Sequence, residues 1–203
     1  MKAHLLLTHG AGASCQSDFM QSLTMALQQH QIQVSLFNFS YMQQRLANQS
    51  KRPPPRAALL VAELADAIRA MPADLPLFVA GKSMGGRVAT LWAAQQANVT
   101  DLAESRVKAV FAYGYPFHPP KQSTWRTEHF ADLRYPVQII QGERDPFGTT
   151  AELLGKAWPN VTIGWLNAAD HDFVPLKRTG LTQQQLITQA AQITNRVIDA
   201  ILT

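Results

Sequence analysis

The chain has 203 residues, of which 46% are hydrophobic and 16% are charged. This balance is typical of a folded globular protein and excludes a disordered chain. The length predicts one domain over residues 1–203 with a substantial core. The net charge, 18 − 14 = +4, is spread along the chain without a block of like charges, so we expect no nucleic-acid partner.

The single cysteine, Cys15, excludes an internal disulfide and suits a reducing compartment. The zinc motifs CxxC and HExxH are absent, and we predict neither a metal nor a cofactor. The apolar part of MKAHLLLTHG is too short for a signal peptide, and no stretch is apolar enough to span a membrane. We therefore expect a cytoplasmic protein without a membrane partner. The oligomeric state does not follow from the sequence.

Strand and helix patterns alternate along the chain. In chain order they predict a strand at 3–8, a helix at 17–30, a strand at 33–39, a helix at 56–71, a strand at 76–80, a helix from Met84 to about Gln96, a strand at 107–112, a helical stretch at 127–133, a strand at 136–141, a helix at 149–157, a strand at 161–166 and a last helix that opens at Thr182. Thr182 and Gln185 have the spacing of a capping box.

This alternation with short loops predicts an α/β fold, a three-layer α/β/α sandwich around a mostly parallel sheet of about six strands. Ligands bind such sheets beyond the carboxyl ends of the strands. Polar and glycine-rich segments follow the predicted strands there: HGAGA, GKSMGG, GYPFHPP, GERDPFG and NAADHDF. We expect these segments to meet at one edge.

The stretch GKSMG places Ser83 between Gly81 and Gly85, after a strand and before a helix. A sharp strand-to-helix turn needs small residues at these positions and projects its central side chain toward solvent. The adjoining helix N-terminus favours negative charge at that place. Ser83 is therefore a candidate nucleophile, although GxSxG also arises by chance.

A serine nucleophile needs a base and an acid that orients the base. In folds with this turn they follow in the order serine, acid, histidine. His171 lies in the loop after the last strand, and Asp145 in the turn after strand 136–141, so we select these two. The competing interpretations are a solvated loop histidine and a turn-forming aspartate.

A tetrahedral oxyanion needs backbone N–H donors. The sequence offers Met84, directly after the nucleophile, and Ala11 or Gly12 in the glycine-rich loop after the first strand. The same loop is also explained as a tight turn, and both interpretations are compatible. His9 is expected to brace it.

Together these segments resemble the α/β-hydrolase superfamily. The closer resemblance is to a compact branch related to dienelactone hydrolases, which includes testis-expressed protein 30 and the third subunit of the non-specific lethal chromatin complex. It runs through LLLTHGAGA, VAGKSMGGRVA, GYPFHPP, IIQGERDPFGT and DHDFVPLKRTG. It implies a minimal, lidless hydrolase with a triad of Ser83, Asp145 and His171.

The resemblance and the motifs together predict a serine hydrolase that cleaves small carboxylic esters or thioesters through an acyl-enzyme. The alternative is a catalytically silent interaction module with the same fold, since some relatives act as scaffolds. The short connection between strands 107–112 and 136–141 disfavours a large lid and long acyl chains. Nucleotide binding is set aside because GASCQS supplies neither GxxxxGK[ST] nor GxGxxG.

Three residues are candidates for substrate binding, Lys82 inside the turn, His118 in GYPFHPP and Arg144 beside Asp145. Further basic residues are expected near the edge: Arg56, Lys121, Arg126, Lys177 and Arg178. They suggest an anionic ester steered by positive charge. The alternative is that they are solvated charges or ion pairs, and Lys82 in particular has the alternative of pairing with a carboxylate. Cys15 is expected to be a small buried thiol.

Overall fold

The computed structural model describes residues 1–49, 52–95 and 106–203. Within them lies a six-stranded sheet in the order β2-β1-β3-β4-β5-β6, with parallel pairing throughout. The strands are β1 (Ala3–Thr8), β2 (Ile32–Phe37), β3 (Leu77–Lys82), β4 (Val107–Tyr113), β5 (Val137–Gly142) and β6 (Val161–Leu166). The helices are α1 (Asp18–Gln28), α2 (Ser40–Asn48), α3 (Ala57–Arg69), α4 (Met84–Ala94), α6 (Thr150–Leu153) and α7 (Gln183–Leu202).

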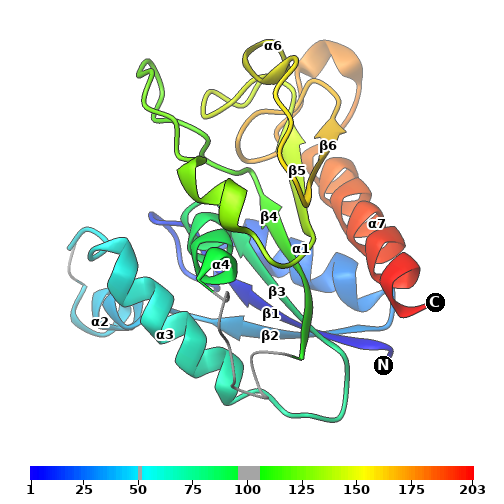
Figure 1. Cartoon of the computed structure of the whole chain (residues 1–203). Helices are drawn as coiled ribbons and strands as arrows, with labels where there is room; N and C mark the ends of the chain where they lie inside the picture. The colour runs from blue at the N-terminus through cyan, green and yellow to red at the C-terminus, as the bar shows by residue number, and fades with distance from the viewer. Residues whose placement is uncertain (50–51, 96–105) are drawn as a thin grey trace.

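The sheet is the middle of three layers (Figure 1), with α1 and α7 on one face and α3 and α4 on the other. Successive side chains of a strand point to opposite faces, so Leu5 and Leu7 of β1 pack with α1 and α7, whereas Leu6 packs with α3 and α4. The inner strands β1 and β3 are buried along their whole length. Burial on both faces explains their nearly continuous apolar sequences.

The predicted three-layer sandwich and parallel sheet are confirmed, with small shifts at the ends of elements. Helix α7 begins after Thr182, and the capping box is formed, because Gln185 N–H donates to the Thr182 hydroxyl and the Gln185 side chain accepts from the Thr182 N–H. The helix predicted from Met84 ends at Ala94. Gln96, its predicted last residue, lies outside the described residues.

Two local predictions differ from the structure, and one helix was not predicted. The stretch predicted as helical at 127–133 forms the 3₁₀ helix η2 (Glu128–Asp132), and the helix predicted at 149–157 is limited to α6. Helix α2 was not predicted, because only Tyr41 and Met42 of its residues are buried, and they leave no apolar stripe at helical spacing.

The connection between β4 and β5, residues 114–136, contains only η2 as regular structure. The two chain ends lie close together (Figure 1), since Lys2 Nζ donates to Asn195 Oδ1 of α7 over 2.7 Å. Within the described part of the chain, none of the helices combines the length and apolar character that crossing a membrane requires.

Candidate active site

Ser83 occupies the turn between β3 and α4. Its backbone angles, φ 51° and ψ −111°, lie in a region that residues other than glycine rarely adopt, at a cost of about 1–3 kcal/mol. The turn is held because Ser83 N–H donates to Tyr113 O (2.9 Å) and Arg87 N–H donates to Ser83 O (3.0 Å). The end of β3 is therefore locked in a strained bend with the serine at its apex.

The two glycines around Ser83 are explained by close backbone contacts. A Cβ at Gly81 would lie 2.1 Å from the carbonyl carbon of Gly85, and one at Gly85 would lie 2.3 Å from Thr8 Oγ1. Neither distance is compatible with a side chain, so the helix approaches the sheet only because both residues lack one.

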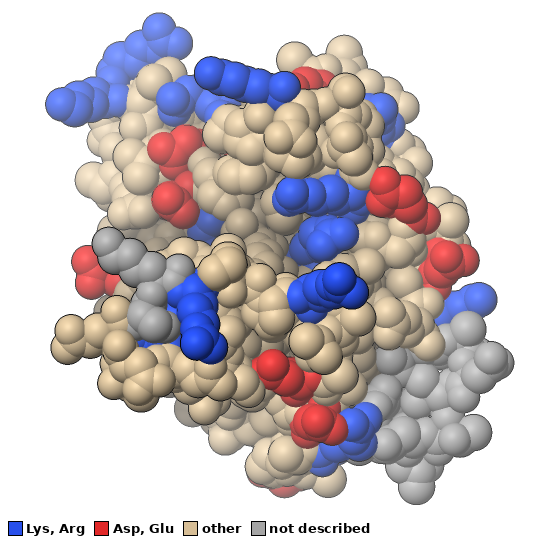
Figure 2. Space-filling view, turned by 90° about the vertical axis from the view of Figure 1, so that its left-hand side faces the viewer, with Lys and Arg blue, Asp and Glu red and all other residues tan. Residues whose placement is uncertain are grey.

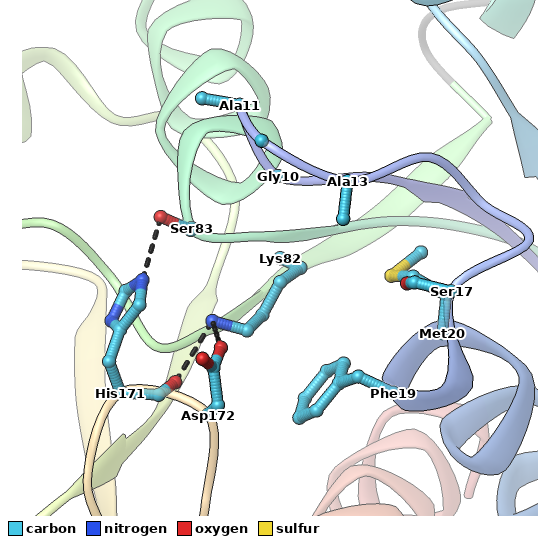
Figure 3. Close-up of a pocket in the computed structure, with 11 residues that line it drawn as sticks. Gly10, Ala11, Ala13, Ser17, Phe19, Met20, Lys82, Ser83, His171 and Asp172 are labelled. Carbon is cyan, nitrogen blue, oxygen red and sulfur yellow. Dashed lines mark hydrogen bonds and ion pairs between the residues drawn. The ribbon is translucent and has the colours of Figure 1, made fainter. Parts of the chain in front are cut away.

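His171, in the loop after β6, joins Ser83 to Asp145. Its Nε2 lies 2.9 Å from Ser83 Oγ, the contact drawn in Figure 3, and its Nδ1 lies 2.8 Å from Asp145 Oδ2. Asp145 is fully buried, whereas Ser83 and His171 remain partly exposed. The structure thus brings together the three residues that the sequence selected from three separate loops.

The Asp145 carboxylate is fixed by two further hydrogen bonds. Gln141 Nε2 donates to Asp145 Oδ2 (2.9 Å), and the N–H of Phe147 donates to Oδ1 (2.8 Å). Gln141, itself fully buried at the end of β5, also accepts from Tyr115 N–H (2.7 Å). Sequence reasoning missed Gln141. The sequence feature that could have identified Gln141 is a polar residue at the end of the apolar run PVQIIQ.

Lys82 points along the edge of the sheet to the loop of His171 (Figure 3). Its Nζ donates to His171 O (2.9 Å) and forms an ion pair with Asp172 Oδ1 (3.1 Å). Burial lowers the pKa of Lys82, and the attraction of Asp172 opposes this effect. Of the two explanations that the sequence left open for Lys82, the structure therefore shows the ion pair with a carboxylate.

The loop after β1 is braced by a buried histidine. Phe39 N–H donates to His9 Nε2 (3.2 Å), so the proton of the neutral ring is on Nδ1, which donates to Gly10 O (2.6 Å). Burial lowers the pKa of His9 and favours this neutral form. Because N–H and C=O point in opposite directions across a trans peptide, the N–H of Ala11 points away from His9.

Two other side chains orient the next peptide. Tyr41 Oη and Arg45 Nη1 both donate to Ala11 O, over 3.1 and 3.2 Å. Among the residues that the structure describes, the N–H groups of Ala11 and Gly12 have no hydrogen-bond acceptor. Met84 is the first residue of α4, so its N–H has no acceptor within the helix.

Ser83 lies between two pockets. One, of about 280 Å³, is lined by the loop 10–13, the start of α1, Lys82 and His171, and is called here the α1 pocket. The other, of about 460 Å³, is lined by Pro55, Leu60, Phe147, Arg87 and Arg126 among others, and is called here the arginine pocket. Both include Ala11.

Three other residues singled out from the sequence lie outside both pockets. His118 is buried, with Nε2 3.4 Å from Glu152 Oε1 and Nδ1 3.0 Å from Pro119 O. Arg144 donates to Ala168 O (2.9 Å). Cys15 is a buried thiol 3.4 Å from Phe37 O, as expected, and burial raises its pKa to about 12.

Solved structures with the same fold include hydrolases. The dienelactone hydrolase of Anabaena variabilis is similar with a TM-score of 0.67 and 20% identity, over 100% of this chain and 88% of that one. Est1E of Butyrivibrio proteoclasticus gives a TM-score of 0.68 and 12% identity, over 98% and 89%. An alpha-beta serine hydrolase homologue from Coxiella burnetii gives 0.66 and 16%, over 96% and 84%.

No curated protein matches the chain. Residues 1–199, nearly the whole length, match the family described as alpha/beta hydrolase domain. The strained serine turn, the parallel sheet and this match agree with one another, and the chain therefore belongs to the alpha/beta hydrolase domain family.

Proposed function

We propose that this protein is a serine hydrolase that cleaves small carboxylic esters or thioesters through an acyl-enzyme on Ser83. The observation that carries the proposal is the unbroken series of contacts from Ser83 Oγ through His171 to the buried Asp145, at 2.9 and 2.8 Å. A hydroxyl is a poor nucleophile at neutral pH, and a base at this distance is what activates it.

In the first half of the reaction, Ser83 Oγ attacks the carbonyl carbon while His171 Nε2 accepts the hydroxyl proton. The negative oxygen of the tetrahedral intermediate accepts hydrogen bonds from Met84 N–H and from Ala11 or Gly12 N–H. His171 then donates the proton to the departing alcohol or thiol, and the acyl group remains on Ser83.

In the second half, His171 takes a proton from water, and the resulting hydroxide attacks the acyl carbon. The intermediate collapses to release the carboxylic acid, and His171 returns the proton to Ser83. The Asp145 carboxylate stabilises the imidazolium that forms in each half. Gln141 and Lys82 act as positioning residues for Asp145 and for the His171 loop.

Two observations support small esters as the substrate class. Structures of similar fold include a dienelactone hydrolase and an esterase domain from Rhodothermus marinus. The pockets at Ser83, about 280 and 460 Å³, suit small ligands. The sequence also resembles the compact branch with testis-expressed protein 30, and we include membership of that branch in the proposal.

Labelling with a fluorophosphonate tests the proposal. The wild-type protein should be labelled at Ser83, and Ser83→Ala should remain unlabelled with kcat/KM for short esters and thioesters reduced by about a thousandfold or more. Ser123→Ala is the matched control, because Ser123 is an exposed serine outside both pockets. A folded wild-type protein that resists labelling and hydrolyses none of the esters contradicts the proposal and favours the interaction module.

A further inference from the structure

Two arginines line the arginine pocket beside Ser83. Arg87 lies one helical turn after Ser83 in α4, and Arg126 belongs to the segment between β4 and β5. The backbone of Arg126 is held at both ends, since its N–H donates to Phe117 O (2.7 Å) and its C=O accepts from Tyr115 Oη (2.8 Å). The backbone position from which its side chain extends is therefore fixed.

Neither guanidinium forms an ion pair with any carboxylate of the described residues. Arg87 Nε is buried and has no hydrogen-bond partner within this part of the chain. By contrast, the side chains of Arg45, Arg106 and Arg144 all donate to backbone carbonyls. A buried N–H without an acceptor is costly, so Arg87, which lines the pocket, has hydrogen-bonding capacity that this part of the chain leaves unused.

The charges of the two arginines affect each other. Burial lowers the pKa of Arg126, and the positive charge of Arg87 lowers it further. Like charges repel, and an anion bound between them would offset the repulsion. Several Lys and Arg side chains lie near the middle of the face drawn in Figure 2, and positive charge on a surface favours the approach of anions.

The rest of the arginine pocket is apolar. Its walls are formed by the proline pair Pro54 and Pro55, by Leu60 and Val88, and by Phe147. Guanidinium groups bind carboxylates through paired hydrogen bonds. The lining therefore matches a short hydrocarbon segment that ends in a carboxylate.

The two pockets differ in their access to His171. The leaving group of an ester must receive its proton from His171 Nε2, and His171 lines the α1 pocket but not the arginine pocket. In the tetrahedral intermediate the leaving group and the acyl chain point in different directions from the carbon. The leaving group thus belongs in the α1 pocket, and the arginine pocket remains for the acyl chain.

We propose that Arg87 and Arg126 form a subsite for a carboxylate at the far end of the acyl chain, so that the substrates are half-esters or half-thioesters of short dicarboxylic acids. This inference rests on the proposed serine hydrolase function and narrows its substrate class. Hydrolysis releases the free dicarboxylate and an alcohol or thiol, with water as the only co-reactant.

Two esters that differ in one group test the subsite. Monoethyl glutarate carries a carboxylate where ethyl pentanoate carries a methyl group. We expect a higher kcat/KM for monoethyl glutarate in the wild type, and a fall of about 10- to 100-fold for this ester in Arg126→Gln, as expected for loss of a charge-assisted hydrogen bond. Arg87→Gln should act in the same direction. For ethyl pentanoate, which has no carboxylate to bind, kcat/KM should fall less than for monoethyl glutarate in both variants.

Arg134→Gln is the matched control, because Arg134 is exposed and lines neither pocket. This variant should leave kcat/KM unchanged for both esters. Equal kcat/KM for the two esters in the wild type, or equal losses for both in Arg126→Gln and Arg87→Gln, would overturn the subsite.

A binding measurement separates this inference from the proposed function. Calorimetry with Ser83→Ala, which needs no turnover, should detect glutarate, and Ser83→Ala combined with Arg126→Gln should lose it. Absence of binding to Ser83→Ala overturns the subsite even if Ser83 is labelled. Glutarate binding with an unlabelled wild-type Ser83 instead overturns the hydrolase function and the ester class, and leaves only an anion site.

Discussion

At the scale of single residues, the turn at Ser83 lowers stability in order to fix the position of one hydroxyl. Ser83 has a φ of 51°, which costs free energy in any residue with a side chain. The strain places Oγ 2.9 Å from His171 Nε2. Because this strain arises from having a side chain at position 83, we expect that removing the Ser83 side chain stabilises the fold and abolishes the proposed activity.

Ser83→Gly should therefore be more stable than Ser83→Ala, which keeps a Cβ and hence the strain. We expect the free energy of unfolding in urea to be about 1 kcal/mol higher for the glycine variant, with no esterase activity in either. Ser123→Gly is the control, since glycine at an exposed loop serine without positive φ should give no such gain. A glycine variant no more stable than the alanine variant would contradict the assignment of strain.

The sequence identified Ser83, Asp145 and His171 because each is the reactive residue type in a loop after a strand. It did not indicate the partners of these residues. Gln141 contacts Asp145 through a side chain that turns back from the end of β5, and Lys82 reaches a carbonyl 89 positions later. Such contacts depend on side-chain direction in three dimensions, which residue spacing does not determine.

At the scale of elements, Lys82 connects the end of β3 to the loop after β6. The connection crosses the edge of the sheet, because β4 and β5 lie between these strands. The effect of burial on the pKa of Lys82 is larger than that of Asp172, so the pKa is lowered. The charged lysine therefore contributes little to the stability of the fold. The contact to His171 O suggests instead that Lys82 holds the loop in position.

Lys82→Met should thus leave the free energy of unfolding within about 1 kcal/mol of the wild type and lower kcat by about tenfold, or roughly 1.4 kcal/mol of transition-state stabilisation. The measurements are urea unfolding and turnover of both ethyl esters.

Both esters should lose kcat equally, because the effect passes through His171. A loss confined to KM for monoethyl glutarate would mean that Lys82 binds substrate. Asp172→Asn is the matched variant. It removes the ion pair and retains the lysine–carbonyl hydrogen bond, and it should have the smaller effect.

The elements themselves were largely predictable from apolar periodicity. The six strands and the helices α1, α3, α4 and α7 bury enough side chains to show a pattern. Helix α2 does not, although its Tyr41 orients the loop at Ala11. Apolar periodicity therefore does not predict this polar helix, because its few buried residues do not recur at helical spacing.

At the scale of the whole molecule, parallel pairing places the carboxyl ends of all six strands at one edge. That single property gathers Ser83, Asp145 and His171, and it follows from strand–helix alternation in the sequence. The arginine pocket does not follow in this way. It combines residues from the segments 54–60, 84–88 and 116–126, whose relative placement depends on how the loops pack.

The pH dependence of stability reflects histidines that fold in the neutral form. His129 is half-buried with Nε2 2.9 Å from Thr90 Oγ1. Burial, and after it the positive charge of Arg87, lower the pKa of His129 from 6.5 to about 4, against the weaker attraction of Glu128 and Asp132. The His129 imidazole is therefore protonated below about pH 6.5 in the unfolded chain but only below about pH 4 in the folded protein.

Stability should accordingly fall as the pH decreases from about 6.5 to about 4 and be fully present above this range. His129→Gln keeps a donor for Thr90 and cannot titrate, so its free energy of unfolding should decrease less over this interval. His4 and His9, whose pKa values burial also lowers, are present in both proteins, so the difference between the two curves isolates His129. Parallel curves from pH 7 to pH 4 would show that this ring is protonated as easily in the fold as in the unfolded chain.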